Sequence, residues 1–154
     1  MTSDVKSIAI EYTIRYRATY HEIFEVKTLQ NKLTVQERHR LGRESEAMAA
    51  DWFLTSKKAK LLARNYRAKC GELDLIFEEL LPSGLFELVF IEVRAKSNRN
   101  WTDGPQSIDP WKQEKLKKTA SHYLSRYRGR AQSLRLDLLA WDGVSWTYLP
   151  NLWI

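Results

Sequence analysis

The segment VFIEVRAK, residues 89–96, begins like a buried β-strand, with three apolar residues, and then carries charged side chains at alternate positions. The charged residues are Glu92, Arg94 and Lys96. Because alternate residues of a strand point to the same face, these three side chains share one face. Burying an ionised side chain without a partner is costly, so the pattern predicts a partner for Glu92.

The preceding strand, GELDLI at residues 71–76, supplies candidate partners. If the intervening turn is centred on Ser83, Asp74 lies opposite Glu92 and Glu72 lies opposite Arg94. Two carboxylates that face each other repel unless something compensates. A divalent cation held by Asp74 and Glu92 is one solution. A ladder of ion pairs that includes Glu72 and Arg94 is the alternative, and the residues alone leave both open.

Length and composition define the broad class of protein. The chain has 154 residues, of which 44% are hydrophobic and 29% charged, so we expect one globular domain with a sizeable core. A single cysteine, Cys70, excludes an internal disulfide. We find neither an apolar segment typical of a signal peptide nor a run of transmembrane length. The expectation is a cytoplasmic protein without a membrane partner.

The positive charge is concentrated in one segment. The formal net charge is +6, and residues 111–130 hold four Lys and three Arg against one Glu. This segment therefore accounts for the whole excess, which favours a polyanionic partner. An apolar stripe that includes Leu116, Ala120 and Tyr123 predicts that the segment is a helix. A solvated basic face without a partner is the alternative.

The remaining patterns predict the organisation of the chain. Residues 1–33 form an N-terminal extension without clear periodicity, and residues 34–154 form the domain. Within it the sequence predicts a helix from Thr34 or from near Gly42, then three strands, a helix and two strands. The predicted strands are 61–66, 72–79, 85–93, 133–141 and 145–154, and the second helix is 111–130. This order indicates an α/β domain with a central mixed β-sheet flanked by helices.

GELDLI followed by FIEVRAK resembles the YraN-like family of bacterial proteins, which is placed in the restriction-endonuclease-like, or PD-(D/E)XK, superfamily. The similarity extends through LGRESEAMAADWFL, SIDPWKQEKL and LRLDLLAW, and covers about residues 40–142. The resemblance implies a restriction-endonuclease-like core, DNA as the partner and phosphodiester hydrolysis with Mg²⁺ (or Mn²⁺).

The resemblance also implies roles for individual residues. Asp74 and Glu92 match the two motif acids, and Glu46 matches a helix glutamate directed toward the metal, so all three are implied metal ligands. Arg94 occupies the position of the motif lysine, where it would orient water or neutralise developing charge. Arginine stays protonated and cannot act as a base, although it can clamp a phosphate. Lys96, on the same face, is a candidate substitute.

Further residues are candidates for DNA binding or for structural roles. Lys112 and Gln113 match the family pattern near the start of the basic helix, and Glu72 is a secondary candidate acid. Asp137 lies in the apolar strand LRLDLLA, and we expect a structural role with Arg135 as a candidate partner. The sequence contains no motif for a nucleotide cofactor and no zinc-ligand spacing. The predicted nucleic-acid contacts are Lys96, Lys112, Gln113, Lys115, Lys117 and Lys118.

These observations leave three hypotheses. The leading one is a metal-dependent DNA endonuclease, with branched or otherwise structured DNA among its substrates. The second is a non-catalytic DNA-binding module that retains the nuclease fold. The third is a structural protein whose ion pairs stabilise the sheet. A two-fold symmetric homodimer would suit a symmetric DNA substrate, and the sequence leaves the oligomeric state open.

Overall fold

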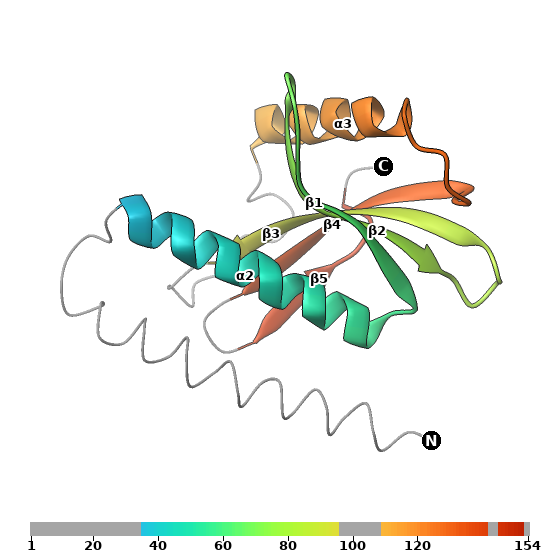
Figure 1. The fold of residues 1–154 in the computed structure, drawn as a ribbon, viewed down its shortest axis with the longest axis horizontal. Coiled ribbons are helices and arrows are strands. Elements are labelled where there is room, and N and C mark those ends of the chain that lie inside the picture. Colours follow the sequence, from blue (N-terminus) through green and yellow to red (C-terminus); the bar gives the residue numbers. More distant parts are fainter. Residues whose placement is uncertain (1–34, 96–108, 142–144, 153–154) are drawn as a thin grey trace, which may run out of the picture.

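The computed structural model describes residues 35–95, 109–141 and 145–152, in which a five-stranded sheet lies between two helices (Figure 1). The strands follow one another across the sheet in the order β1-β2-β3-β4-β5. The β3–β4 pair is parallel and the other pairs are antiparallel. The elements are α2 (Val35–Ser56), β1 (Ala59–Ala68), β2 (Gly71–Leu80), β3 (Phe86–Ala95), α3 (Pro110–Leu124), β4 (Ser133–Trp141) and β5 (Trp146–Leu149).

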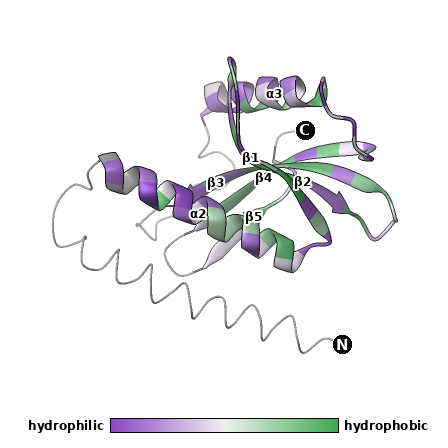
Figure 2. Cartoon of the chain, viewed as in Figure 1, coloured by the Kyte–Doolittle hydropathy of each residue, from purple (hydrophilic) through white to green (hydrophobic). Residues whose placement is uncertain are grey.

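This architecture confirms the predicted α/β class with a mixed sheet and a restriction-endonuclease-like core. The parallel pair requires a crossover between β3 and β4, and α3 lies in that connection. In β2 and β3, whose two faces are both covered, short apolar runs such as Leu88–Ile91 alternate with charged residues, and the strands show both colours in Figure 2.

The β2–β3 hairpin has the predicted register from Leu75, which pairs with Ile91, to Leu80, which pairs with Phe86. A tight turn joins the strands, and the Gly84 N–H donates to the Leu81 carbonyl at 2.9 Å. Gly84 has a φ of 83°, a conformation that favours glycine. The prediction of a turn centred on Ser83 is therefore confirmed.

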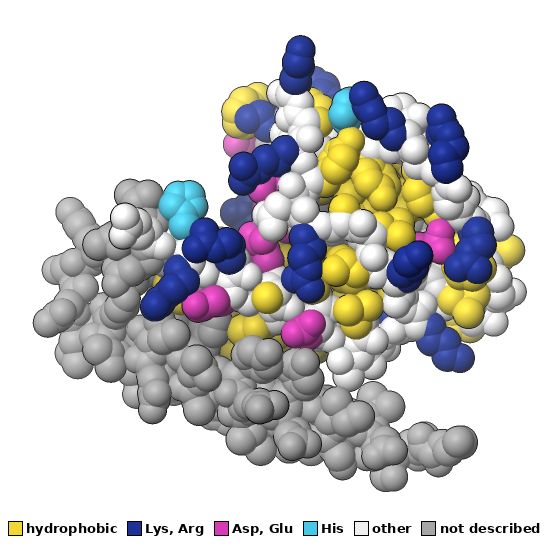
Figure 3. Space-filling view, in the orientation of Figure 1, with side chains coloured by type: hydrophobic (Ala, Val, Ile, Leu, Met, Phe, Trp, Pro, Cys, Tyr) yellow, Lys and Arg dark blue, Asp and Glu magenta, His cyan; other side chains and the backbone are white. Residues whose placement is uncertain are grey.

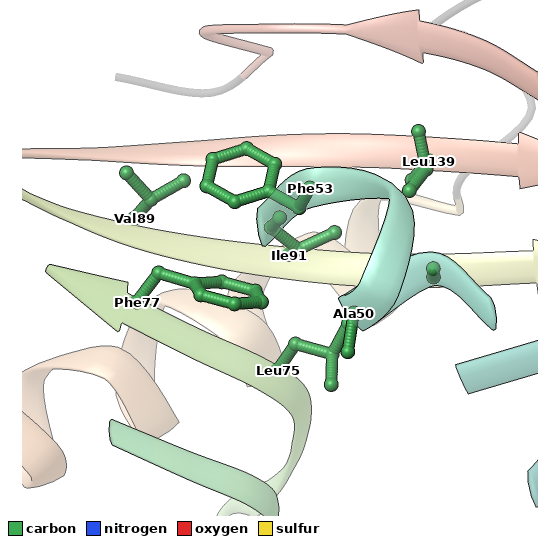
Figure 4. Packing of buried hydrophobic residues seen from close by; sticks show 8 residues of the cluster. Ala50, Phe53, Leu75, Phe77, Val89, Ile91 and Leu139 are labelled. Carbon is green, nitrogen blue, oxygen red and sulfur yellow. The ribbon is translucent and has the colours of Figure 1, made fainter. Parts of the chain in front are cut away.

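Each face of the sheet carries its own buried cluster. The α2 face packs Ala50 and Phe53 against Phe77, Val89 and Ile91, together with other buried side chains (Figure 4). The rings of Phe53 and Phe77 lie 4.6 Å apart. The α3 face buries Leu116 and Ala120 of the helix against side chains from the strands, namely Leu73, Ile76, Leu88, Phe90 and Leu136. The sheet is thus fixed between two apolar layers.

Several predicted boundaries differ from the observed ones. α2 begins at Val35, so the earlier of the two predicted starts is confirmed, and the helix continues through Gly42. Thr34 itself lies outside the described residues, as do the extension 1–33 and most of the predicted loop between β3 and α3. β5 ends at Leu149, before Pro150, because proline has no N–H to donate to the sheet.

The prediction of a helix through residue 130 is wrong, because α3 ends at Leu124. The following residues turn back toward β4, and the Tyr127 hydroxyl and the Arg130 N–H both donate to Glu78 of β2. These contacts hold residues 126–130 in a loop, so the three arginines of the basic segment lie beyond the helix. Neither α2 nor α3 has both the length and the apolar character needed to cross a membrane.

Candidate active site

Asp74 lies where β2 and β3 separate. The backbone pairing of the two strands ends at Leu75 and Ile91. Beyond this pair the Val93 N–H donates to the Asp74 carboxylate at 2.8 Å, so a side chain replaces the backbone partner. Asp74 is thereby held close enough to Glu92 for the two charges to interact.

Glu92 is buried, and only one of its two carboxylate oxygens has a partner among the described residues. Its exposure is 4%, and its Oε1 lies 3.2 Å from Lys112 Nζ and 3.2 Å from Arg94 Nε. The Arg94 contact lacks hydrogen-bond geometry. The second oxygen, Oε2, has no hydrogen-bond partner among the residues that the structure describes. A buried carboxylate oxygen without a donor is costly, which marks this atom as a candidate ligand for a cation.

The environment of Asp74 raises its pKa to about 7. Burial is the main cause, and the nearby charge of Glu92 is the second. The hydrogen bond from Val93 acts in the opposite direction because it stabilises the ionised carboxylate. A carboxyl group whose pKa is shifted toward neutral pH by burial and a neighbouring carboxylate is typical of functional sites.

Glu46 reaches the same region from α2. Its Oε2 accepts a hydrogen bond from Asn65 Nδ2 at 2.8 Å, and its charge adds to the rise in the pKa of Asp74. The described residues contain no group of three or more His, Cys, Asp or Glu side chains arranged to hold a metal ion. Asp74 and Glu92 still provide the one or two carboxylates that Mg²⁺ commonly uses with water ligands.

Lys112 lies closer to the acid pair than the sequence predicted. The start of α3 fixes its position, because the Asp109 side chain accepts the Trp111 N–H at 3.0 Å and Pro110 occupies the first turn. The sequence indicated Lys112 only as a phosphate contact. Its contact with Glu92 depends on the packing of α3 across the sheet, for which no local pattern gives a signal.

A basic groove opens beside the acid pair. Its volume is about 890 Å³, and its lining includes Trp111, which is 65% exposed. The Lys115 ammonium lies 3.4 Å from the centre of the Trp111 ring. The sequence did not identify Trp111 as a site residue. Five cations line the groove against the carboxylates of Glu72 and Asp109, and they are Arg67, Lys69, Arg94, Lys112 and Lys115.

The other predicted residues have different surroundings. Glu72 forms an ion pair with Arg67 at 3.1 Å, so the alternative of a Glu72–Arg94 ladder is wrong. The reason is that Arg67 is the register partner of Glu72 across the β1–β2 hairpin. Gln113 is half-buried on α3, whereas Lys117 and Lys118 are exposed. Lys96 lies outside the described residues.

A second charged cluster occupies the α2 face of the sheet near the β2–β3 turn. Arg135 is 8% exposed, and its Nε donates to Asp137 at 2.9 Å. Its guanidinium also donates to Glu79 and Glu87. Asp137 further accepts hydrogen bonds from the Tyr148 hydroxyl at 2.6 Å and the Asn151 N–H at 2.9 Å. These contacts confirm the predicted pairing of Asp137 with Arg135.

Fold and charge pattern together define a restriction-endonuclease-like α/β domain with a pair of acids beside a basic groove. The model of a family described as the uncharacterised protein family UPF0102 matches residues 45–140. The chain belongs to this family, which is the YraN-like family that the sequence predicted.

Relatives support this membership over most of the domain. A UPF0102 protein of Legionella pneumophila (strain Corby) is 38% identical over 113 residues, which cover 71% of this chain and 91% of the relative. A UPF0102 protein of Thermodesulfovibrio yellowstonii is 36% identical over 114 residues, which cover 74% of this chain and 96% of the relative. One from Methylococcus capsulatus is 35% identical over 99 residues, covering 64% and 75%.

Proposed function

We propose that this protein is a metal-dependent DNA endonuclease that hydrolyses phosphodiester bonds, including those of branched or structured DNA. The observation that carries the proposal is the Asp74–Glu92 pair, in which a buried Glu92 oxygen lacks a donor in the described part of the chain. This pair adjoins a cationic groove with an exposed tryptophan. An acid pair of this kind suits a divalent cation, and the groove suits a polyanion.

Mg²⁺ (or Mn²⁺) is the proposed cofactor, held by Asp74 and Glu92 with Glu46 as a further ligand. The donor set fits because carboxylate oxygens are the ligands that these hard cations prefer. When bound, the ion supplies positive charge that activates water and polarises the phosphoryl group. The raised pKa of Asp74 fits this role, because a cation replaces the proton that burial and Glu92 otherwise favour.

In this proposal, two cations next to Glu92 together perform the functions of the lysine in the PD-(D/E)XK motif. Arg94 remains protonated and provides a guanidinium that can hold a phosphate by two hydrogen bonds. Lys112 supplies an ammonium 3.2 Å from Glu92 Oε1, in a position to orient water or to donate a proton to the leaving oxygen. A lysine ammonium is therefore available at the proposed site, although residue 94 of the strand is arginine.

The groove and α3 form the proposed DNA surface. Lys112 and Lys115 line the groove, and Gln113, Lys117 and Lys118 lie on the same helix. We propose Lys96 as an additional DNA contact. Trp111 offers a flat apolar surface on which an unpaired base can stack, which would suit DNA with single-stranded or branched regions.

One observation favours a second candidate, the non-catalytic DNA-binding module. Lys112 and Arg94 both lie at Glu92 Oε1, so these cations already offset part of the negative charge without a metal. In such a protein the basic groove would bind DNA, and the acid pair would serve only to position α3. Metal-dependent cleavage distinguishes the two candidates.

The decisive experiment compares cleavage and binding in matched variants. Wild-type protein is incubated with plasmid, duplex and four-way-junction DNA in Mg²⁺, Mn²⁺, Ca²⁺ or EDTA. We expect cleavage in Mg²⁺ or Mn²⁺, and a loss of at least about 100-fold in Asp74→Asn and Glu92→Gln with DNA affinity retained. Glu114→Gln, which removes an exposed carboxylate of α3, is the matched control and should cleave normally.

Each outcome assigns the protein to one class. Binding without cleavage under any metal would support the DNA-binding module. Cleavage that persists in Asp74→Asn and Glu92→Gln would indicate a contaminating enzyme and remove the nuclease assignment. Absence of DNA binding would leave the structural protein as the remaining hypothesis.

A further inference from the structure

A cavity at the C-terminal end of α3 contains charges that the proposed active site does not use. Its volume is about 420 Å³, and Leu62, Tyr123 and Tyr127 form its apolar lining. Four cations surround it, namely Lys60, Arg126, Arg128 and Arg130, and Glu78 is the one carboxylate in its lining. Figure 3 shows a hollow with a hydrophobic floor between α3 and β1, with Lys and Arg side chains around it.

The loop that carries the three arginines is held firmly in place. Glu78 is 6% exposed and accepts hydrogen bonds from the Tyr127 hydroxyl, the Arg130 N–H at 3.0 Å and the Arg130 guanidinium at 3.1 Å. The Tyr127 oxygen in turn accepts the Ala131 N–H at 3.0 Å. The Tyr127 ring folds over Gly129 so closely that a Cβ there would overlap it. The cations are therefore presented by a preformed loop, which lowers the entropic cost of binding a ligand.

The charge of this cavity is not balanced from within the described part of the molecule. Arg130 pairs with Glu78, so the single carboxylate already has its counter-charge. The Arg126 guanidinium forms a hydrogen bond with Nε2 of His122 at 2.7 Å, and the Arg128 guanidinium donates to the Tyr127 carbonyl at 2.8 Å. Among the described residues, no carboxylate lies within ion-pair distance of Lys60, Arg126 or Arg128.

We propose that this cavity is a second nucleic-acid contact, which binds a backbone phosphate between Lys60, Arg126 and Arg128. The attached sugar or base would lie over Tyr123 and Tyr127. Arginine suits this ligand because its planar donors match phosphate oxygens in pairs. This inference rests on the DNA partner of the proposed function, and it concerns where that DNA lies.

The position of the cavity predicts the length of DNA that the protein needs. α3 has 15 residues, and Lys112 and the cavity lie at its opposite ends. A helix rises 1.5 Å per residue, so the two contacts are roughly 20 Å apart. Because a DNA strand advances about 3.4 Å per base pair, this span corresponds to about six base pairs. Substrates that end closer to the cleavage site than this should lose the second contact.

The test is a salt titration of DNA binding in matched charge variants. Affinity for a labelled 20-base-pair duplex is measured by fluorescence anisotropy across salt concentrations, without divalent metal. The double variant Arg126→Gln/Arg128→Gln removes two cavity cations, and Lys58→Gln/Arg64→Gln removes two exposed cations that lie outside both the cavity and the groove. The single variant Lys60→Gln removes a cation on β1 and leaves the loop intact.

The expected result is a change in the slope of log affinity against log salt. Each phosphate contact contributes about 0.9 to that slope, so losing the one phosphate held at the cavity should lower it by about 0.9 in the cavity double variant, and by less in Lys60→Gln, which keeps both arginines. The control should change it by less than half as much as the cavity double variant. Circular dichroism and melting curves that match the wild type would show that the loop variants fold.

Other outcomes separate this inference from the proposed function. If the cavity and control double variants lose slope equally, the second contact is wrong, while DNA binding itself stands. If wild type binds no DNA but binds deoxyadenosine monophosphate, and the cavity variant does not, the cavity takes a free nucleotide and the proposed function is wrong. If wild type binds neither ligand, both proposals are wrong.

Discussion

The β2–β3 hairpin carries a pair of carboxylates at each of its two ends, and the two pairs have opposite surroundings. Near the turn, Glu79 lies opposite Glu87 in the backbone register. At the other end, Asp74 and Glu92 approach each other beyond the last backbone pair. The same hairpin therefore brings together two pairs of like charges, and different neighbours compensate them.

Arg135 of β4 closes the first pair. Its guanidinium donates to both Glu79 and Glu87, and its Nε donates to Asp137. Among the described residues, no single cation donates to both Asp74 and Glu92. Lys112 and Arg94 lie at one oxygen of Glu92, while the other oxygen lacks a donor in the described residues and Asp74 has a raised pKa. The first pair is complete as a structural element, whereas the second keeps a carboxylate oxygen without a donor in the described residues, where we propose that a cation binds.

The largest expected effect comes from removing Arg135, which compensates the Glu79–Glu87 pair; we call this the closed pair. Arg135→Met leaves three carboxylates near one another with little access to water, and breaking a buried ion pair in this way costs about 3–5 kcal/mol. Urea unfolding followed by circular dichroism measures the loss. Arg94→Met is the matched control at the other pair, where the arginine side chain is 37% exposed, and we expect a loss below about 1 kcal/mol. Equal losses would show that the two pairs do not differ in this respect.

The next effect is a pH dependence of stability caused by Asp74. It should appear in the Asp74–Glu92 pair, which we call the open pair, and not in the Glu79–Glu87 pair. The folded pKa of Asp74, about 7, exceeds the ordinary value of 3.8, so the folded state binds this proton more tightly than the unfolded state. The contribution of Asp74 to stability is complete below the ordinary value and is lost as the pH rises toward 7. Metal-free wild type should therefore lose up to about 4 kcal/mol over this window relative to Asp74→Asn, because each unit of pKa difference corresponds to about 1.4 kcal/mol.

This comparison has its own control in the closed pair. Unfolding free energies are measured in urea at several pH values in EDTA, and the difference between variant and wild type is plotted against pH. Glu87→Gln should not remove the dependence that Asp74→Asn removes. A pH-independent difference for Asp74→Asn would contradict the assignment of the raised pKa to Asp74.

A divalent metal should stabilise the protein through the open pair. A ligand at ten times its dissociation constant stabilises the folded state by about 1.4 kcal/mol. Thermal unfolding in Mg²⁺ or Mn²⁺ against EDTA at neutral pH should show this gain in wild type and in Glu87→Gln. The gain should disappear in Asp74→Asn and Glu92→Gln. Stabilisation that persists in those two variants would place the metal elsewhere.

The smallest expected effect concerns Glu46. Glu46→Gln removes one negative charge near Asp74 and keeps an oxygen that can accept the Asn65 hydrogen bond. The pKa of Asp74 should therefore fall, and stability in EDTA should change by only a few tenths of a kcal/mol. The pKa is measured by carboxyl-carbon NMR titration. A rise in the pKa would contradict the proposed proximity of the two acids.

Local rules predicted the hairpin that carries both pairs. Alternation along residues 89–96 and the turn at Ser83 predicted the register, and the register predicted that Asp74 and Glu92 meet. The family resemblance added Glu46, whose charge acts on Asp74 in the structure. The register prediction succeeded because strand periodicity and turn length act over a few residues.

Contacts between distant elements were not predictable in the same way. The structure places Lys112 on Glu92, exposes Trp111 in the groove and ends α3 at Leu124. Each depends on how α3 and the loop after it pack on the sheet. The alternative of a Glu72–Arg94 pair failed because β1 supplies a nearer partner for Glu72, and the sequence did not show that β1 pairs alongside β2 in this register.

The sequence by itself determined the α/β class, the hairpin that brings Asp74 to Glu92 and the position of the excess positive charge. The tertiary structure decided which pair is neutralised and which stays open, because the cations that approach Glu92 and Glu79 come largely from α3 and β4. Short-range geometry sets which residues share a strand face. Compensation of buried charge depends on the packing of distant elements, and in this protein that packing distinguishes the candidate site from a structural ion pair.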